Sequence, residues 1–486
     1  MLSLRAAYEA ELKDKDLQIE ALKFQLLQLK RARFGASAER FDPNQPGLFE
    51  EDLEADLAAA EARHALADLA PPGKPVRHRP KRQLLPRIEH RHEREDCTCG
   101  TCGQALTVIG EAISEQLDVI PAQFFVHRHI RPQYACRHCD TVTAVPPPPQ
   151  VIDKGLPAPG LLAQILVSKY ADHVPLYRQA VIYARQGVFI PRSTQAGWVG
   201  ASEVLLEPLV ERLREYLLAE SYLQADETRL PVLAPGTGKT HTGYLWVYRT
   251  GPWSALRAVV FDYAQGRGQT WPTAFLESFE GTLQIDGYAG YNGVLAREES
   301  LEAGCWAPCR RAFFDVFKAT RSPVAAEALR RVGRLYEIEA DTKDLAPTAR
   351  AEQRQAWAEP LLKDFKNWLD DMLLKLPPAS SLAQAIGYTL GRWPALLVYL
   401  KDGRIHIDTN PVERALRGVA VGRRNYLFAG SANGGRRAAL LYSLIETCKL
   451  NGVDPYAYLK EVLTRLPTLP VRDLDELLPW RWRPGP

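Results

Sequence analysis

The spacing of hydrophobic and polar residues changes along the chain, and the changes predict the order of its secondary structure. The middle of the chain contains short apolar runs rich in β-branched and aromatic side chains, which are typical of strands. Four such runs span residues 222–226, 243–249, 256–262 and 283–286. Residues 268–279 have a helical pattern, and residues 302–306 resemble a fifth, short strand. This order can place the first and fourth strands side by side in one sheet.

Two of these runs end in an aspartate, Asp226 and Asp286. A carboxylate at the mouth of a buried strand is unfavourable unless a positive charge lies against it. If the two strands are neighbours, both carboxylates lie at one edge of the sheet, as a divalent-metal site for phosphoryl transfer requires. The simpler alternative is that each aspartate begins a turn, where this residue type is common.

A third acidic ligand is expected near residue 410. Asn410 suits a helix N-cap and Pro411 suits the first helical position, so Glu413 lies in the first turn. Glu413 then either satisfies its own helix end or serves as the third metal ligand, and Asp408 is the rival candidate.

Arginines near this helix, and near the start of the helix expected after residue 306, are candidates for DNA contacts: Arg310, Arg311, Arg423 and Arg424.

The N-terminal region has a different pattern. Residues 4–34 are helical in pattern, and their heptad spacing predicts a short coiled coil and self-association, the alternative being an amphipathic helix packed on its own domain. An acidic, Ala-rich helix is expected at 48–69. The segment 71–94 is basic and interrupted by prolines. It is either an extended segment that binds along a phosphate backbone or a solvated linker.

Three helices are predicted at 161–170, 175–185 and 192–218. The tight connection between the second and the third is of the helix-turn-helix type. The third helix would present its first turn, Arg192, Ser193, Thr194 and Gln195, to phosphates or base edges, although most helix pairs with short turns do not read DNA. Residues 322–400 are expected to be mostly helical, with Trp357 among the residues of their apolar faces.

Composition and cysteine usage narrow the class of protein to which the chain can belong. With 46% hydrophobic and 24% charged residues and a net charge of +3, the 486-residue chain fits a soluble multidomain protein whose nucleic-acid affinity must come from local clusters. We expect no membrane span and no signal peptide, and therefore a reducing cytoplasm. The spacing of Cys99, Cys102, Cys136 and Cys139 predicts one structural zinc ion held by four thiolates, with Cys97 left over and His138 as a competing ligand.

The segment 235–240 ends like a nucleotide-binding loop. The required first glycine is replaced by Leu233, and the segment is followed by a strand where a phosphate-binding loop needs a helix. A nucleoside triphosphatase is therefore excluded.

Several motifs in one order resemble the insertion-sequence-66 family of bacterial transposases. They are Asp226-Glu-Thr228, Gly243-Tyr-Leu-Trp-Val-Tyr248, Leu283-Gln-Ile-Asp-Gly-Tyr-Ala-Gly-Tyr291, Cys305-Trp-Ala307, Ile407-Asp-Thr-Asn-Pro-Val-Glu413, Gly422-Arg-Arg-Asn-Tyr-Leu-Phe-Ala-Gly-Ser431 and Leu441-Tyr-Ser-Leu-Ile-Glu-Thr447. The resemblance implies a ribonuclease-H-like domain with an Asp-Asp-Glu triad, which selects Glu413 over Asp408. Two positions depart from the family pattern: Pro308 replaces a histidine, and Thr409 replaces an asparagine.

The resulting expectation is a multidomain α+β protein. Its parts are a coiled coil (1–34), an acidic helix and basic linker (35–95), a zinc ribbon (96–145), a helix-turn-helix-like region (155–218), a ribonuclease-H-like catalytic core (219–437) with a helical insertion at about 322–400, and a C-terminal helical segment (438–486).

The function implied by the resemblance is that of a transposase in the bacterial cytoplasm, associated with the nucleoid. It would use two Mg²⁺ or Mn²⁺ ions to cleave DNA at the terminal inverted repeats of its element and to join the ends to target DNA. Small accessory proteins of the same element are further candidate partners. The alternative is a zinc-dependent DNA-binding protein, or an inactive copy, that binds element ends without cutting.

Overall fold

The computed structural model describes residues 123–135, 142–144, 149–152, 155–234 and 239–483. The chain divides into two compact units, Met1–Gln116 and Leu117–Pro486, and all of the described residues belong to the second. The expected coiled coil, the acidic helix, the basic linker and the four zinc ligands Cys99, Cys102, Cys136 and Cys139 lie outside the described residues. In the described part, a short antiparallel pair is formed by β1 (Gln133–Ala135) and β2 (Val142–Ala144).

A five-stranded mixed sheet forms the centre of the second unit, with the strand order β5-β4-β3-β6-β7. The strands are β3 (Tyr222–Ala234), β4 (Lys239–Thr250), β5 (Val259–Ala264), β6 (Gly281–Gln284) and β7 (Ser300–Ala303). β3, β4 and β5 are antiparallel neighbours, whereas β3, β6 and β7 run parallel. The prediction that the first and fourth runs lie side by side is therefore confirmed, because β3 pairs with β6.

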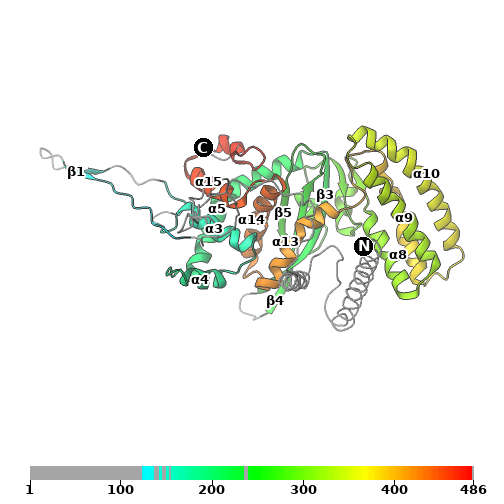
Figure 1. Cartoon of the computed structure of the whole chain (residues 1–486), viewed down its shortest axis with the longest axis horizontal. Coiled ribbons are helices and arrows are strands. Elements are labelled where there is room, and N and C mark those ends of the chain that lie inside the picture. The colour runs from blue at the N-terminus through cyan, green and yellow to red at the C-terminus, as the bar shows by residue number, and fades with distance from the viewer. Residues whose placement is uncertain (1–122, 136–141, 145–148, 153–154, 235–238, 484–486) are drawn as a thin grey trace, which may run out of the picture. The chain divides into compact units, whose positions relative to one another are not determined.

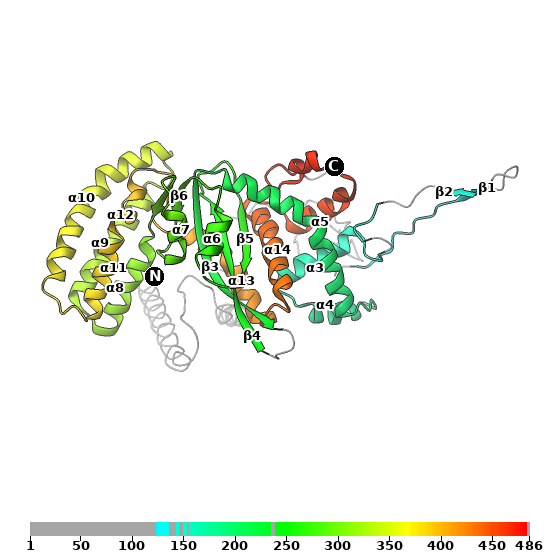
Figure 2. The same cartoon turned by 180° about the vertical axis from the view of Figure 1, so that it is seen from behind.

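Helices cover the sheet because its strands are apolar on both faces. Figure 1 shows α13 (Asn410–Tyr426) in front of the sheet, and Figure 2 shows α6 (Thr270–Phe275) and α7 (Asn292–Leu295) in front of the opposite face. Tyr248 of β4 stacks on Phe275 of α6 with ring centroids 4.0 Å apart. The short helix α6 covers less than the 268–279 expected from the pattern.

The outer edge of β5 is closed by α14 (Ala432–Leu450). The backbone N–H groups of Val259 and Phe261 donate to the hydroxyls of Thr447 and Ser443, at 3.0 and 2.8 Å. An open strand edge would expose unpaired backbone groups, so these two buried hydroxyls satisfy two outward-facing N–H groups of β5.

A first hydrophobic core joins the sheet to α3 (Pro159–Tyr170), α4 (Leu176–Ala184), α5 (Arg192–Leu218), α14 and α15 (Pro455–Arg465). The three helices expected before residue 218 are thus confirmed to within two residues at each end. Short 3₁₀ turns, η3 (Leu466–Thr468) and η4 (Val471–Leu477), follow α15.

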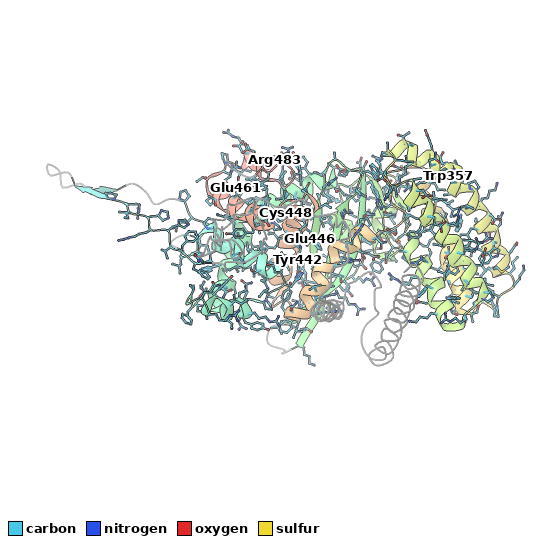
Figure 3. The ribbon with its side chains drawn as sticks, viewed as in Figure 1. Trp357, Tyr442, Glu446, Cys448, Glu461 and Arg483 are labelled. Atoms are coloured by element: carbon cyan, nitrogen blue, oxygen red, sulfur yellow. The ribbon has the colours of Figure 1, made fainter. Side chains whose placement is uncertain are left out.

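A second core lies among the helices between β7 and α13. These helices are α8 (Trp306–Thr320), α9 (Pro323–Asp341), α10 (Pro347–Leu373), α11 (Ser381–Gly391) and α12 (Trp393–Leu396), followed by η2 (Val398–Leu400). Trp306, Phe365 and Trp393 form its aromatic centre. Trp357 was expected on an apolar face, but its side chain is half exposed on α10 (Figure 3).

One buried ion cluster belongs to this second core. Glu339 of α9 accepts hydrogen bonds from Arg350 and Arg354 of α10, and all three residues are less than a tenth exposed. Arg354 also donates to the carbonyls of Tyr399 and Asp402, so the cluster ties α9 and α10 to the segment that leads toward α13. None of the described helices is both long and apolar enough to cross a bilayer.

Candidate active site

The parallel register of β3 and β6 brings the two predicted aspartates together. Gln224 lies opposite Gln284, and Asp226 and Asp286 each follow two residues later. Residues two apart on a strand share a face, so Asp226 lies on the same side of the sheet as Gln224, and Asp286 follows Gln284 by the same offset. Asp286 itself lies just past the end of β6, where its Oδ1 accepts a hydrogen bond from the Tyr288 N–H at 3.0 Å.

Asp226 is the carboxylate on which burial and the neighbouring negative charges act together. Burial raises its pKa well above the ordinary value, and the negative charges of Glu227, Asp286 and Glu413 raise it further. The Glu227 N–H donates to its Oδ1 at 2.8 Å, which opposes the rise only in part. The fold therefore brings Asp286 and Glu413 within electrostatic range of Asp226, although the three residues come from segments far apart in the sequence.

The carboxylates do not form a finished coordination shell. Across the described ranges, no three His, Cys, Asp or Glu side chains come close enough to hold an ion together. The donor set is nevertheless suited to a hard divalent cation, since it consists of carboxylate oxygens. Burial and mutual repulsion at Asp226 leave a deficit of positive charge that such a cation would offset.

Glu227 is a fourth carboxylate, to which the sequence pattern assigned no role. It alternates with Asp226 along β3 and so faces the opposite side of the sheet. There it accepts a hydrogen bond from Arg267 Nε at 2.8 Å, and the guanidinium lies 3.7 Å from the ring centroid of Tyr288. Burial raises the pKa of Glu227, and Arg267 counteracts that effect.

The start of α13 carries both candidates for the third ligand. Asp408 is 5% exposed, and its two oxygens accept hydrogen bonds from the Asn410 N–H at 3.1 Å and from Asn410 Nδ2 at 2.7 Å. Asn410 was expected to be the N-cap, but the cap is Thr409 and Asn410 is the first helical residue. Asp408 therefore organises the helix start, whereas Glu413 is half-buried in the first turn.

The helices of the second core hold the turn that carries Asp286. Tyr388 of α11 donates its hydroxyl to the Asp286 carbonyl at 3.0 Å, and the Arg392 guanidinium lies against Gly287, where φ is +96°. Burial lowers the pKa of Arg392, and the charge of Asp286 raises it in part. Neither residue was predicted, since about a hundred positions separate them from Asp286 and no local pattern connects them.

Pro308, one of the departures from the family pattern, lies in the first turn of α8. A proline is tolerated there because the backbone N–H groups of a first helical turn have no intrahelical partner. Arg310 and Arg311 follow on the same helix, and both are exposed.

The residues predicted to contact DNA differ in their exposure. Arg192, Ser193 and Thr194 are exposed in the first turn of α5. Gln195 is fully buried, and its Nε2 donates to the Ile190 carbonyl at 3.0 Å, so it holds the turn between α4 and α5. The fold therefore buries the amide that was predicted to contact phosphates or base edges.

The second predicted basic group lies near the end of α13. Arg424 is exposed, while Arg423 is half-buried and donates to the Arg229 carbonyl of β3. Arg178 of α4 donates to Asn425 Oδ1 at 3.1 Å, which links the helix-turn-helix-like region to this end of α13.

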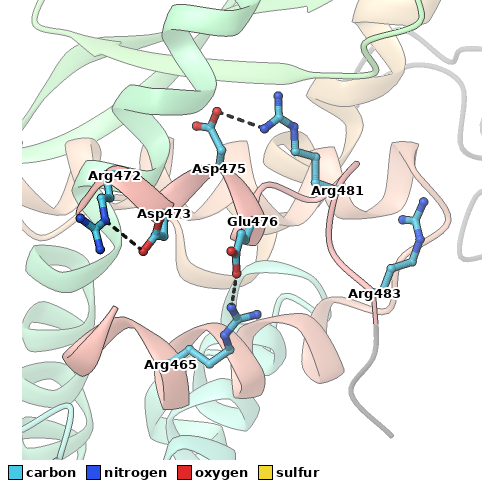
Figure 4. A pocket seen from close by; sticks show the side chains of 7 residues that line it. All are labelled: Arg465, Arg472, Asp473, Asp475, Glu476, Arg481 and Arg483. Carbon is cyan, nitrogen blue, oxygen red and sulfur yellow. Dashed lines mark hydrogen bonds and ion pairs between the residues drawn. The ribbon is translucent and has the colours of Figure 1, made fainter. Parts of the chain in front are cut away.

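A cavity of about 430 Å³ lies at the C-terminal end, apart from the carboxylates. Its walls carry both charges, and Figure 4 shows Arg465 paired with Glu476 at 2.6 Å and Arg481 paired with Asp475 at 3.1 Å. Its cations are thus largely offset by its own acidic residues, and it does not belong to the candidate active site.

Comparisons with known proteins match most of the chain to one family. Residues 154–437 match the family described as "Transposase IS66 family", and residues 443–480 match the IS66 C-terminal element. Residues 96–140 match the zinc-finger binding domain of transposase IS66, and residues 21–90 match "Transposase C of IS166 homeodomain".

Two relatives from Sinorhizobium fredii are similar over nearly the whole chain. The uncharacterized protein y4jD is 37% identical over 485 residues, covering 95% of this chain and 94% of its own. The uncharacterized protein y4qI is 37% identical over 481 residues, covering 94% of this chain and 88% of its own.

Proposed function

The chain belongs to the IS66 family of insertion-sequence transposases, and on that premise we propose that Asp226, Asp286 and Glu413 hold the divalent metal ions with which it cuts and joins DNA. We propose further that the mixed sheet and its flanking helices form a ribonuclease-H-like core, into which the helices of residues 322–400 are inserted. The coiled coil at 1–34 and self-association through it are part of the same proposal.

One observation carries the metal assignment: Asp226 is a half-buried aspartate, and the charges that act on it include those of three other carboxylates. The pKa of Asp226 is raised by burial and by Glu227, Asp286 and Glu413 together. A fold that gathers like charges in a partly buried place is unfavourable unless an ion of opposite charge binds there. We propose that the bound ions draw the three ligand carboxylates into one coordination shell.

Two divalent ions, Mg²⁺ or Mn²⁺, would supply Lewis acidity for the attacking oxygen and would offset the charge of the phosphate under displacement. In the first reaction, water attacks a phosphodiester at the element end, a new P–O bond forms, and the bond to the 3′ oxygen breaks to free a 3′-hydroxyl. In the second, that hydroxyl attacks a target phosphodiester in the same way. Tyr388 and Arg392 hold the Asp286 turn, and Asp408 fixes the start of the helix that carries Glu413.

We also propose that Cys99, Cys102, Cys136 and Cys139 hold a structural zinc ion, since they lie within the zinc-finger match at 96–140. The proposed DNA contacts are made by exposed or half-buried groups of the described part: Arg192, Ser193, Thr194, Arg310, Arg311, Arg423 and Arg424. Such contacts to phosphates position the protein without reading sequence.

Nicking of DNA that carries the ends of the element tests the proposal. The wild-type protein should nick this DNA with Mg²⁺ and not with a chelator, and Asp226→Asn should abolish nicking while DNA binding persists. A variant that still nicked would remove Asp226 from the metal site. A wild-type protein that bound the ends and never cut them would support the alternative of a DNA-binding protein without nuclease activity.

A further inference from the structure

We propose that Gln284 and Gln224 are positioning residues that hold together the three segments carrying Asp226, Asp286 and Glu413. This inference rests on the proposed function, because it explains how the metal ligands are kept in register. The two glutamines lie opposite each other on β6 and β3, each two residues before an aspartate. Both are completely buried.

Gln284 uses the full hydrogen-bonding capacity of its amide. Its Oε1 accepts from the Tyr222 hydroxyl at 2.6 Å and from Gln224 Nε2 at 2.8 Å. Its Nε2 donates to the carbonyls of His406 at 2.7 Å and Gly304 at 3.1 Å. A primary amide has two donors and can accept two hydrogen bonds, so this amide is saturated.

These four bonds join four separate segments. They connect β6 to β3, to the residue that follows β7, and to the segment that leads into α13. Gln224 adds a second bond to that last segment, since its Nε2 also donates to the Asp408 carbonyl at 3.2 Å. The carboxylate of the same Asp408 accepts hydrogen bonds from Asn410 at the start of α13, so the path of contacts reaches the helix that carries Glu413.

Stability alone does not account for two amides at this place. A pair of aliphatic side chains would fill the interior of the sheet without the desolvation of four polar groups. One oxygen, Gln224 Oε1, has no hydrogen-bond partner among the described residues, so a residual penalty persists. What the glutamines add is direction, because hydrogen bonds of fixed geometry set the segment 406–408 against the sheet, whereas aliphatic contacts are non-directional.

The perturbation that tests this role is Gln284→Met, which keeps the length of the side chain and removes its four hydrogen bonds. The control is Gln179→Met. Gln179 is 1% exposed, donates to the carbonyls of Ile165 and Val174, and accepts from the Tyr183 hydroxyl, all within the helical region of α3 and α4. Both variants lose a buried, hydrogen-bonded amide, but only Gln284→Met loses contacts to the segments with the metal ligands.

The first readout is the dissociation constant for Mn²⁺, measured by electron paramagnetic resonance on the zinc-loaded full-length protein. The Asp226→Asn protein, measured in the same way, shows how much Mn²⁺ binds at other sites. We expect Gln284→Met to weaken Mn²⁺ binding about 10–100-fold, as the loss of groups that orient metal ligands does elsewhere. Gln179→Met should bind Mn²⁺ like the wild type. In the metal-free protein, hydrogen exchange across residues 404–410 should rise in Gln284→Met and stay unchanged in Gln179→Met.

The outcomes separate this inference from the proposed function. A wild-type protein with no Mn²⁺ site above the Asp226→Asn background would overturn the metal-site assignment itself. Wild-type affinity in a folded Gln284→Met protein, or an equal loss in Gln179→Met, would overturn the positioning role. If Gln284→Met does not fold, Gln224→Met provides the test, because it removes only the bonds to Gln284 and Asp408. Its affinity should fall as well, and an unchanged value would refute the inference.

Discussion

Replacing Asp226 with asparagine should stabilise the metal-free protein and at the same time remove its response to divalent cations. Asparagine keeps an oxygen that can accept the Glu227 N–H, so the local hydrogen bond survives the substitution. It removes the charge that Glu227, Asp286 and Glu413 oppose. A residue that only shaped the fold would show the reverse, a loss of stability with an intact cation response.

The size of the stabilisation by Asp226→Asn follows from the spacing between neighbouring strands of the sheet. Neighbouring strands lie about 4.8 Å apart, and Asp226 and Asp286 follow the paired Gln224 and Gln284 with the same offset. Two unit charges about 5 Å apart repel by about 3 kcal/mol at an effective dielectric constant of about 20, and by about 1 kcal/mol in water. Because Asp226 is half-buried, we expect its replacement to raise the free energy of unfolding by about 1–3 kcal/mol, or several degrees in Tm.

The pH dependence of the stabilisation by Asp226→Asn has a definite sign. The folded-state pKa of Asp226 is raised, so the folded protein binds this proton more tightly than the unfolded chain does. The wild type is therefore penalised at pH values above the raised pKa, and the penalty disappears as pH falls toward the ordinary aspartate value of 3.8. The stabilisation by Asp226→Asn should be largest at alkaline pH and vanish in acid.

The assay is thermal unfolding in the presence of a chelator, repeated with Mg²⁺ or Mn²⁺. A cation at a hundredfold excess over its dissociation constant should stabilise the wild type by about 2.7 kcal/mol, and Asp226→Asn by much less. Asp262→Asn is the matched control. Burial raises the pKa of Asp262 on β5 to about 6 despite the nearby Arg214, so this variant should also be stabilised above that pH, but it should keep the cation response.

Either of two results would refute the reasoning. If Asp226→Asn lowered the Tm of the metal-free protein at alkaline pH, the aspartate would not suffer repulsion in the fold. If the variant kept the wild-type response to Mn²⁺, Asp226 would not be a ligand.

Three further predictions concern other parts of the chain. Glu339→Gln leaves two arginines buried without a counter-charge and should lower the free energy of unfolding in urea by about 3–5 kcal/mol, whereas Glu337→Gln, in an exposed pair on the same helix, should cost less than about 1 kcal/mol. Metal analysis should find one zinc ion per wild-type chain and none in Cys136→Ser; an unchanged zinc content would exclude that thiolate. Arg192→Ala should reduce by about 0.9 the slope of log affinity for DNA against log salt, measured by fluorescence anisotropy. Arg330→Ala, an exposed arginine of α9, should leave that slope unchanged, and equal slopes in all three proteins would remove Arg192 from the DNA contacts.

The amino-acid sequence by itself determined the elements whose signals are local. Runs of β-branched and aromatic residues specified the strands, and the order of these strands with the intervening helix made the pairing of β3 with β6 foreseeable. Asp226 and Asp286 could be predicted as a pair for that reason, because each follows a run that forms part of the paired strands β3 and β6. The predicted strand end at Asp226 was wrong, since β3 continues past it to Ala234, whereas Asp286 does lie beyond the end of β6. The three helices before residue 218 were equally evident, because helical periodicity and helix-end signals act over a few residues.

Tertiary structure decided everything that depends on partners remote in the chain. The hydrogen bonds from Asn410 to the Asp408 carboxylate at the start of α13 are visible only in the folded protein. From the sequence alone, Gln195 resembles a residue that contacts DNA. In the fold, its amide is buried and donates to the Ile190 carbonyl. The contact between Gln224 and Asp408 spans 184 residues. A local pattern cannot specify such contacts, because which distant groups meet depends on how the sheet and both cores pack together.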